Sequence, residues 1–170
     1  MSGNRIEAVA SSPPARLVAL GWLALAAGAL VYLTDRDPSR ALLLPAVGSP
    51  FGTPLFGAIG LWLPSFVHPF AFSLFTAAIA PPGTRPAYWA CALWWAVDAA
   101  FEAAQAPALR DALVPLLDAP SVSSWGTNAL GSYLRLGTFD AADLLAATAG
   151  AIAAALVLHF NQSREKRNAR

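Results

Sequence analysis

The chain has 170 residues, of which 56% are hydrophobic and 12% are charged, and its formal net charge is +1. Soluble domains carry about 25% charged residues, so this composition excludes an ordinary soluble domain and predicts an integral membrane protein. The near-neutral charge excludes a general electrostatic footprint for nucleic acid, and the single cysteine, Cys91, excludes a disulfide framework and a cysteine-cluster metal site.

Four apolar segments have the length of a membrane-crossing helix, about 17–25 residues. We interpret the first as a retained anchor, because its apolar run is longer than that of a signal peptide. The sequence therefore predicts an all-α fold, a polytopic bundle of four transmembrane helices within residues 17–160, with a cytoplasmic N-terminal tail (1–16) and a basic cytoplasmic tail (161–170). The four predicted spans are residues 17–33, 61–80, 87–106 and 140–160.

The distribution of Lys and Arg predicts the orientation, because cytoplasmic flanks carry the excess of positive charge. With the N-terminus inside, seven basic residues fall on the inner side and four on the outer side. This count predicts that both termini lie in the cytoplasm. The inner residues are Arg5, Arg16, Arg85, Arg164, Lys166, Arg167 and Arg170, and the outer ones are Arg36, Arg40, Arg110 and Arg135.

The connections between the predicted spans differ in length. Residues 81–86 form a tight inner turn, so the second and third helices are expected to be antiparallel neighbours. Residues 34–60 and 107–139 form two longer outer loops. The first of these is apolar and rich in Pro and Gly, which suits a segment at the membrane interface. In the second, ALRDALVPLLDAP predicts a short interfacial helix and WGTNALGSYLRLG a turn-rich cap.

Three polar residues lie on one stripe of the third predicted helix. Asp98, Glu102 and Gln105 are spaced by four and three residues, which places them on one helix face. A charged residue at the centre of a span costs about 2.5–3.5 kcal/mol on insertion scales. The stripe is therefore expected to face protein or water, and lipid exposure is excluded.

The other intramembrane ionisable groups fall at a similar depth. With a rise of about 1.5 Å per residue, Asp98 lies near the midplane and Glu102 about 6 Å further out. Because successive helices alternate in direction, His68 is expected just outside the midplane, Asp143 in the outer part of the membrane and Asp140 at its boundary. The sequence thus predicts one polar layer in the outer half of the bundle.

His68 lies between Pro64 and Pro69 in the second predicted helix. Proline at position 69 removes one helical hydrogen bond and disfavours helical geometry at His68. A kink is therefore expected, with His68 either at a functional site or hydrogen bonded to the freed carbonyl.

Small residues repeat every four positions in the fourth predicted helix. This spacing is typical of close packing between membrane helices. Asp143 shares a face with Ala147 and Gly150, so its carboxylate is expected to have room beside a neighbouring backbone. The repeating residues are Ala142, Ala146, Gly150 and Ala154.

The polar layer admits several roles. Crowded carboxylates in a low dielectric share protons, so Asp98 and Glu102 are candidates for protonated donors, proton carriers, or counter-ions to Arg135 folded in from the outer loop. A metal site of His68, Glu102 and Asp143 is an alternative, but their spacing matches no short metal motif, and we expect no metal and no cofactor. A polar network that only fixes helix packing is a further alternative.

Three short motifs in residues 60–160 resemble the VanZ-like family of small membrane proteins. They are FVHPFAF with His68, the E-x-x-Q of Glu102 and Gln105, and GTFDAADLLAATAG with Asp143 and Gly150. The chain has Ala147 where the family has Asn, and Pro64 and Ser65 where it often has Asp-Lys. The resemblance implies an outward-facing functional set of His68, Glu102, Gln105, Arg135 and Asp143. It names no established biochemical activity, although one family member is linked to teicoplanin resistance.

The leading hypothesis is a VanZ-like cell-envelope function, in which the polar site binds a polar headgroup or a lipid-linked envelope precursor. A second hypothesis is an accessory subunit of a larger membrane complex, for which the small-residue stripe and the apolar outer loops are the motive. A third is a proton-linked transport or enzymatic role centred on Asp98. The sequence does not decide whether the chain is an enzyme. The partners expected are the lipid bilayer, and other membrane subunits or a lipid-linked envelope component.

Overall fold

The computed structural model describes residues 13–35, 54–80, 86–121 and 124–168. Within these ranges the chain forms six helices and no strand, as the predicted all-α fold requires. The helices are α2 (Pro13–Thr34), α3 (Gly57–Ile79), α4 (Pro86–Ala104), α5 (Pro107–Leu117), α6 (Trp125–Leu136) and α7 (Ala141–Asn168).

Three of these helices are long and apolar enough to cross a membrane, namely α2, α3 and α7. Only 22–28% of the residues in their most apolar windows are buried, so most of this apolar surface faces outward, as it does on membrane-crossing helices. By this criterion three of the four predicted spans are confirmed, and the remaining one is not. Helix α4, predicted as the span 87–106, has 19 residues, and its apolar sequence is interrupted by Asp98 and Glu102.

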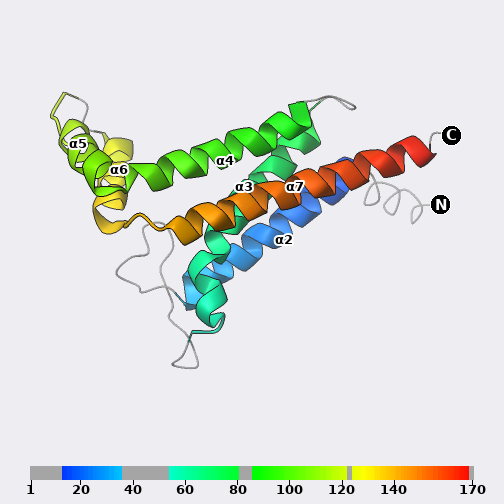
Figure 1. Ribbon diagram of the computed structural model, residues 1–170, viewed down its shortest axis with the longest axis horizontal. Helices are drawn as coiled ribbons and strands as arrows, with labels where there is room; N and C mark the ends of the chain where they lie inside the picture. Colours follow the sequence, from blue (N-terminus) through cyan, green and yellow to red (C-terminus); the bar gives the residue numbers. More distant parts are fainter. Residues whose placement is uncertain (1–12, 36–53, 81–85, 122–123, 169–170) are drawn as a thin grey trace.

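The four long helices pack with alternating direction (Figure 1). Helix α3 is central, because it packs against α2, α4 and α7, while α4 also packs against α7. The contact His68–Asp98 and the contact Thr76–Trp94 show that α3 and α4 are antiparallel, as predicted. The predicted turn at 81–86 lies almost wholly outside the described residues.

Helices α3 and α7 run parallel to each other. Ser65 donates a hydrogen bond to Asp143 near the start of α7, and further along both helices Gly150 lies against Phe66 and Pro69. The predicted close approach at the small-residue stripe is confirmed, since Gly150 and Ala154 are buried and a Cβ at position 150 would lie 3.0 Å from the Phe66 carbonyl carbon.

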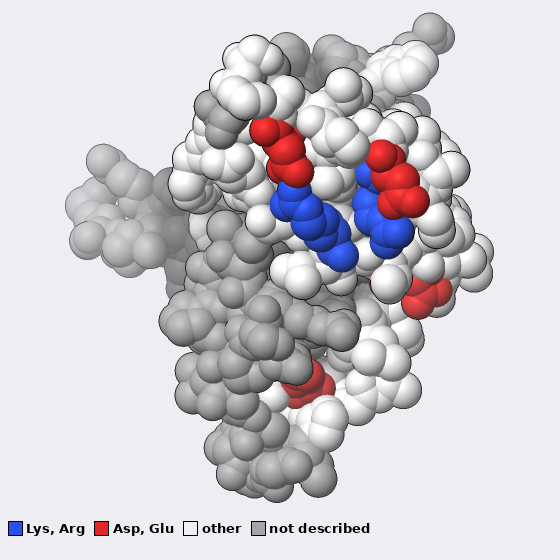
Figure 2. Space-filling model, turned by 90° about the vertical axis from the view of Figure 1, so that its left-hand side faces the viewer, with Lys and Arg blue, Asp and Glu red and all other residues white. Residues whose placement is uncertain are grey.

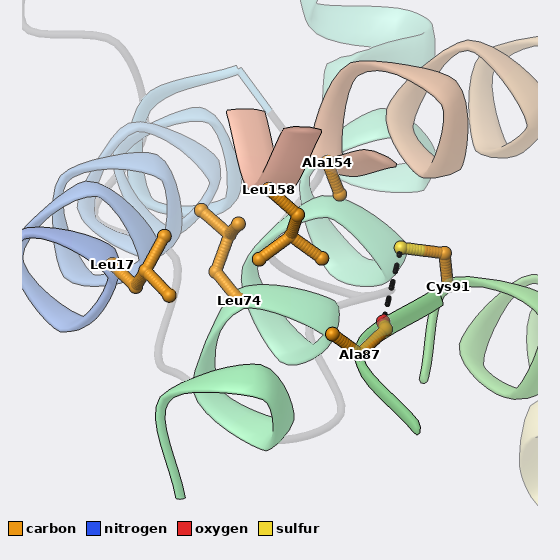
Figure 3. Close-up of a cluster of buried hydrophobic side chains, with 6 residues drawn as sticks. All are labelled: Leu17, Leu74, Ala87, Cys91, Ala154 and Leu158. Carbon is orange, nitrogen blue, oxygen red and sulfur yellow. Dashed lines mark hydrogen bonds between the residues drawn. The ribbon is translucent and has the colours of Figure 1, made fainter. Parts of the chain in front are cut away.

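The apolar core lies at the end of the bundle opposite α5 and α6. It contains a cluster of buried side chains from α2, α3, α4 and α7 (Figure 3). Cys91 is one of them, as expected for a small apolar residue, and its thiol lies 3.8 Å from the Ala87 carbonyl oxygen. The cluster consists of Leu17, Leu74, Ala87, Cys91, Ala154 and Leu158.

Residues 107–139, predicted as an outer loop, form two helices. The first, α5, confirms the predicted short helix. The second, α6, corrects the predicted turn-rich cap at WGTNALGSYLRLG. Ser124 and Thr127 form a reciprocal capping box at its start, which satisfies backbone donors that would otherwise be unpaired. Leu134 is 1% exposed, so α6 buries an apolar side chain. The helix forms although Gly126 and Gly131 lower its helix propensity.

Most of the loop 34–60, including the predicted interfacial segment, lies outside the described residues. Its two ends meet at Asp35, whose carboxylate accepts the backbone N–H groups of Leu55 and Phe56, both at 2.7 Å. Thr34 donates a further bond of 2.8 Å. Asp35 thus ties the end of α2 to the start of α3.

Replacing Asp35 by Asn is expected to remove a pH-dependent part of the stability. Loss of hydration raises the pKa of Asp35, but hydrogen bonds from Thr34, Phe56, Leu55 and Gly57 lower it below the ordinary value of 3.8. A depressed pKa stabilises the folded chain above that ordinary value and ceases to do so as the pH falls through the folded-state value.

Thermal unfolding of the full chain in detergent, from about pH 6 to about pH 2.5, tests this expectation. Asp35→Asn is expected to be less stable at the higher pH, with the difference from the native chain shrinking on acidification. Asp111→Asn, which removes an exposed carboxylate, is the control. Equal melting curves of Asp35→Asn and Asp111→Asn at all pH values would contradict the role of Asp35.

Candidate functional site

The predicted polar residues come together in three contacts between different helices. His68 Nδ1 lies 2.6 Å from Asp98 Oδ1 and joins α3 to α4. Ser65 Oγ lies 2.8 Å from Asp143 Oδ1 and joins α3 to α7. Glu102 accepts the backbone N–H of Asp140 and joins α4 to the start of α7.

Helix α3 is continuous through Pro64 and Pro69. The imidazole of His68 is bonded to Asp98, so the alternative in which it bonds the freed carbonyl is not the one observed. His68 is 39% exposed and Asp98 18% exposed by side chain.

Glu102 and Gln105 are the most enclosed polar residues of the predicted set. They are 9% and 6% exposed. The Gln105 side chain packs against the backbone of Gly137, where an added Cβ would lie 3.0 Å from its Cγ atom. The E-x-x-Q motif is thus buried at the junction where α4 meets the segment that leads into α7.

Asp140 has a capping position. Its Oδ1 atom accepts the backbone N–H of Ala142 at 2.8 Å, and its carbonyl accepts the N–H groups of Asp143 and Leu144. A carboxylate here also interacts favourably with the positive end of the α7 dipole. Asp140 therefore shapes the start of α7, while its backbone N–H holds Glu102.

Tyr133 is a residue of this region that the sequence analysis missed. Burial, together with the nearby groups Tyr32, Glu102, Asp143 and Asp98, raises the pKa of Tyr133 to about 12. Its ring packs edge-on against Phe101, with centroids 5.9 Å apart. The phenol therefore stays protonated at neutral pH. It brings a hydroxyl group to the acidic layer formed by Asp98, Glu102, Asp140 and Asp143. In the sequence, the capping box of Ser124 and Thr127 indicates that Tyr133 lies in a helix.

Arg135 does not join the acidic layer. Its guanidinium pairs with Asp118, at the end of α5, and both side chains are nearly half exposed. Figure 2 shows this end of the molecule, where basic side chains lie beside acidic ones, in line with the Arg135–Asp118 and Arg110–Asp111 pairs. The predicted role of Arg135 as counter-ion to Asp98 or Glu102 is wrong, because Asp118 is its neighbour across the α5–α6 contact.

The acidic layer also provides no metal centre of the kind considered for His68, Glu102 and Asp143. Across the described ranges, no group of three or more His, Cys, Asp or Glu side chains is placed to hold a metal ion.

Comparisons with protein-family models, curated proteins and solved structures gave no match.

The layer is rich in hydrogen-bond acceptors and poor in cations. Among the described residues, the one salt bridge that reaches it is His68–Asp98. Glu102 and Asp143 are bonded to a backbone N–H and to a hydroxyl group. Each carboxylate keeps further acceptor capacity, so the layer suits a group that carries N–H or O–H donors.

Proposed function

We propose that this chain is an integral protein of the bacterial inner membrane, VanZ-like in kind, whose polar site binds the donor-rich headgroup of a lipid-linked envelope component. The observation that carries the proposal is the burial of Glu102 and Gln105 at the α4–α7 junction. Buried acceptors without a cationic partner are costly in an apolar bundle, so a structural role alone gives little reason to retain them.

The charge of the site favours hydroxyl or amine groups of such a headgroup over its phosphates. Glu102 interacts electrostatically with Asp140 and Asp143, and Arg135 is engaged by Asp118. An anionic group would meet these carboxylates without compensation, whereas N–H and O–H groups would satisfy their remaining lone pairs.

The packing of the stripe also supports this proposal over the alternative of an accessory subunit. The small-residue stripe of α7 was one motive for a partner protein. Three of its four residues, Ala146, Gly150 and Ala154, are buried within the chain itself, with Gly150 against α3, whereas Ala142 is exposed. The stripe is therefore used internally, and only the apolar outer loops remain as a motive for that alternative.

The parallel packing of α3 and α7 supports a fourth crossing by α4. If two parallel helices both cross the membrane, the chain between them must return across it. Helix α4 is the long antiparallel helix that lies between them in sequence and packs against both. We therefore propose that α4 crosses with its polar side chains directed at α3 and α7, and that both termini are cytoplasmic.

The contacts of α4 explain how such a helix crosses despite its polar residues. Trp94 Nε1 donates to Thr76 and Trp95 Nε1 donates to Thr148, both at 2.9 Å. Asp98 and Glu102 contact α3 and the start of α7. These four side chains thus find partners inside the bundle, which reduces the cost of burying them in lipid.

Mass spectrometry of lipids that co-purify with the chain in mild detergent tests the proposed binding. Glu102→Gln and Asp143→Asn are expected to lose about tenfold of a specifically bound, donor-rich lipid, since each hydrogen bond to a charged group contributes about 1.5–3 kcal/mol. The idea fails if both variants stay folded and retain the same lipids as the native chain. A co-purifying protein without a bound lipid would favour the accessory subunit.

A subtler variant perturbs the site without removing a carboxylate. Gly137→Ala is expected to push the Gln105 side chain out of place and to weaken lipid retention several-fold, because the added Cβ overlaps that side chain. Gly126→Ala is the matched control, since the nearest atom to its added Cβ is 3.9 Å away. Equal lipid retention in the two alanine variants would argue against a part for Gln105.

A further inference from the structure

His68 and Asp98 form an ionisable pair in an otherwise uncharged part of the bundle. Helix α3 contains no other ionisable residue, α2 has none over residues 17–31, and α7 has none over residues 144–158. The next ionisable groups towards α5 and α6 are Glu102 on α4, Tyr133 on α6, and Asp140 and Asp143 at the start of α7. The charge of this part of the bundle is therefore set by one imidazole and one carboxyl group.

Aromatic rings surround the imidazole. The Phe72 ring lies 4.6 Å from the His68 ring and the Trp94 ring lies 5.7 Å from it edge-on, measured between centroids. Trp94 is fixed by its bond to Thr76. These contacts hold the imidazole in its position beside Asp98.

The carboxyl group has one bonded and one unbonded oxygen. Asp98 Oδ1 contacts His68, whereas Asp98 Oδ2 is buried and, within the described part of the chain, has no hydrogen-bond partner. An ionised carboxylate in such a place is costly unless a cation lies beside it. His68 is the neighbouring group that supplies such a charge.

The geometry fixes where a proton binds. A carboxylate at 2.6 Å holds Nδ1 as the protonated nitrogen, so Nε2 carries the lone pair in the neutral ring. When a proton from water binds, an N–H bond forms at Nε2 and the pair becomes uncharged overall. When this bond breaks, the proton returns to water and a net charge of −1 is left between α3 and α4.

We propose that His68 and Asp98 form a proton-binding site, and that proton binding at Nε2 tightens the contact between α3 and α4. The side chain of His68 is 39% exposed, so the ring is not sealed inside the bundle. The proposal does not rest on the proposed lipid-binding function, because that function uses Glu102, Gln105 and Asp143.

A double-variant experiment measures the coupling between the two groups. In the full chain in detergent at about pH 8, His68→Gln is expected to lower the melting temperature by about 10 °C, because the buried Asp98 carboxylate loses the N–H donor at Nδ1. Asp98→Asn introduced into that variant is expected to restore more than half of the loss. Acidification to about pH 5 is expected to restore His68→Gln but not to change the double variant. Additive losses at both pH values would overturn the pairing.

Nitrogen-15 NMR of the imidazole tests proton binding directly, even if a variant unfolds. The chain has two histidines, so His159→Gln leaves His68 alone in a full-length chain held in bilayer nanodiscs. Between about pH 8 and about pH 5, the range in which imidazoles change charge, Nε2 is expected to pass from its unprotonated to its protonated form. An Nε2 signal that keeps one form over this range, or that Asp98→Asn leaves unchanged, would overturn the proposal.

Discussion

Gly150→Leu is expected to lower the free energy of unfolding by about 3 kcal/mol, which is at the upper end of the range for overpacking. The reason is the contact between α7 and α3. A Cβ at position 150 would collide with the Phe66 carbonyl oxygen and would lie 3.2 Å from the Pro69 ring. The carbonyl belongs to the helix backbone and cannot rotate away, so α7 would have to shift as a whole.

The matched control is Ala149→Leu, one position earlier on the exposed side of α7. Thermal unfolding of both variants in the same detergent is expected to differ by about 6–12 °C, given the size of the chain. Similar melting temperatures would mean that α7 does not depend on this close approach. Because Asp143 meets Ser65 through the same helix pair, Gly150→Leu is also expected to disturb the acidic layer.

The common level of the polar residues along the bundle was predictable because helix rise and alternating direction are enough to compare positions on neighbouring helices. His68 and Asp98 are bonded, and Glu102 meets the start of α7, as a common layer requires. The individual partners were not predictable, because depth says nothing about the rotation of each helix about its axis. Ser65, which bonds Asp143, carries no charge that would have drawn attention.

Residues 107–139 show where local sequence misleads. Two interior glycines of WGTNALGSYLRLG, Gly126 and Gly131, lower the helix propensity, whereas the capping box uses Thr127 in place of the usual Glu or Gln. The turn-rich interpretation followed from the first signal and missed the second. Without α6 as a helix, the direction of Arg135 and the position of Tyr133 could not be inferred.

Asp35 shows a different limit. Its partners Leu55 and Phe56 lie 20 and 21 residues further along the chain, and no periodic pattern connects them. In the sequence, Asp35 marks only the end of the first apolar run. Contacts that close a long loop depend on where the two helix ends meet in space, and this is set by packing along the whole of α2 and α3.

An impermeant thiol reagent is expected to label position 124 from one side of the membrane and positions 15 and 163 from the other, with more than tenfold selectivity in each case. The experiment uses Cys91→Ala as background, because Cys91 is the one native cysteine, with single cysteines at Ala15, Ser124 and Ser163. The expected pattern follows from four crossings, in which α4 returns the chain between the parallel helices α3 and α7.

A chain with crossings at α2, α3 and α7 alone gives a different pattern. Position 124 would then share a side with position 15, and position 163 would lie opposite both. That arrangement needs α7 antiparallel to α3, which conflicts with the contacts Ser65–Asp143 and Phe66–Gly150. Labelling therefore decides whether α4 crosses the membrane. Its packing against α3 and α7 favours a crossing, although its own composition falls short of the criterion for a span. Inverted vesicles identify the side of position 15 and so test the cytoplasmic location of the termini.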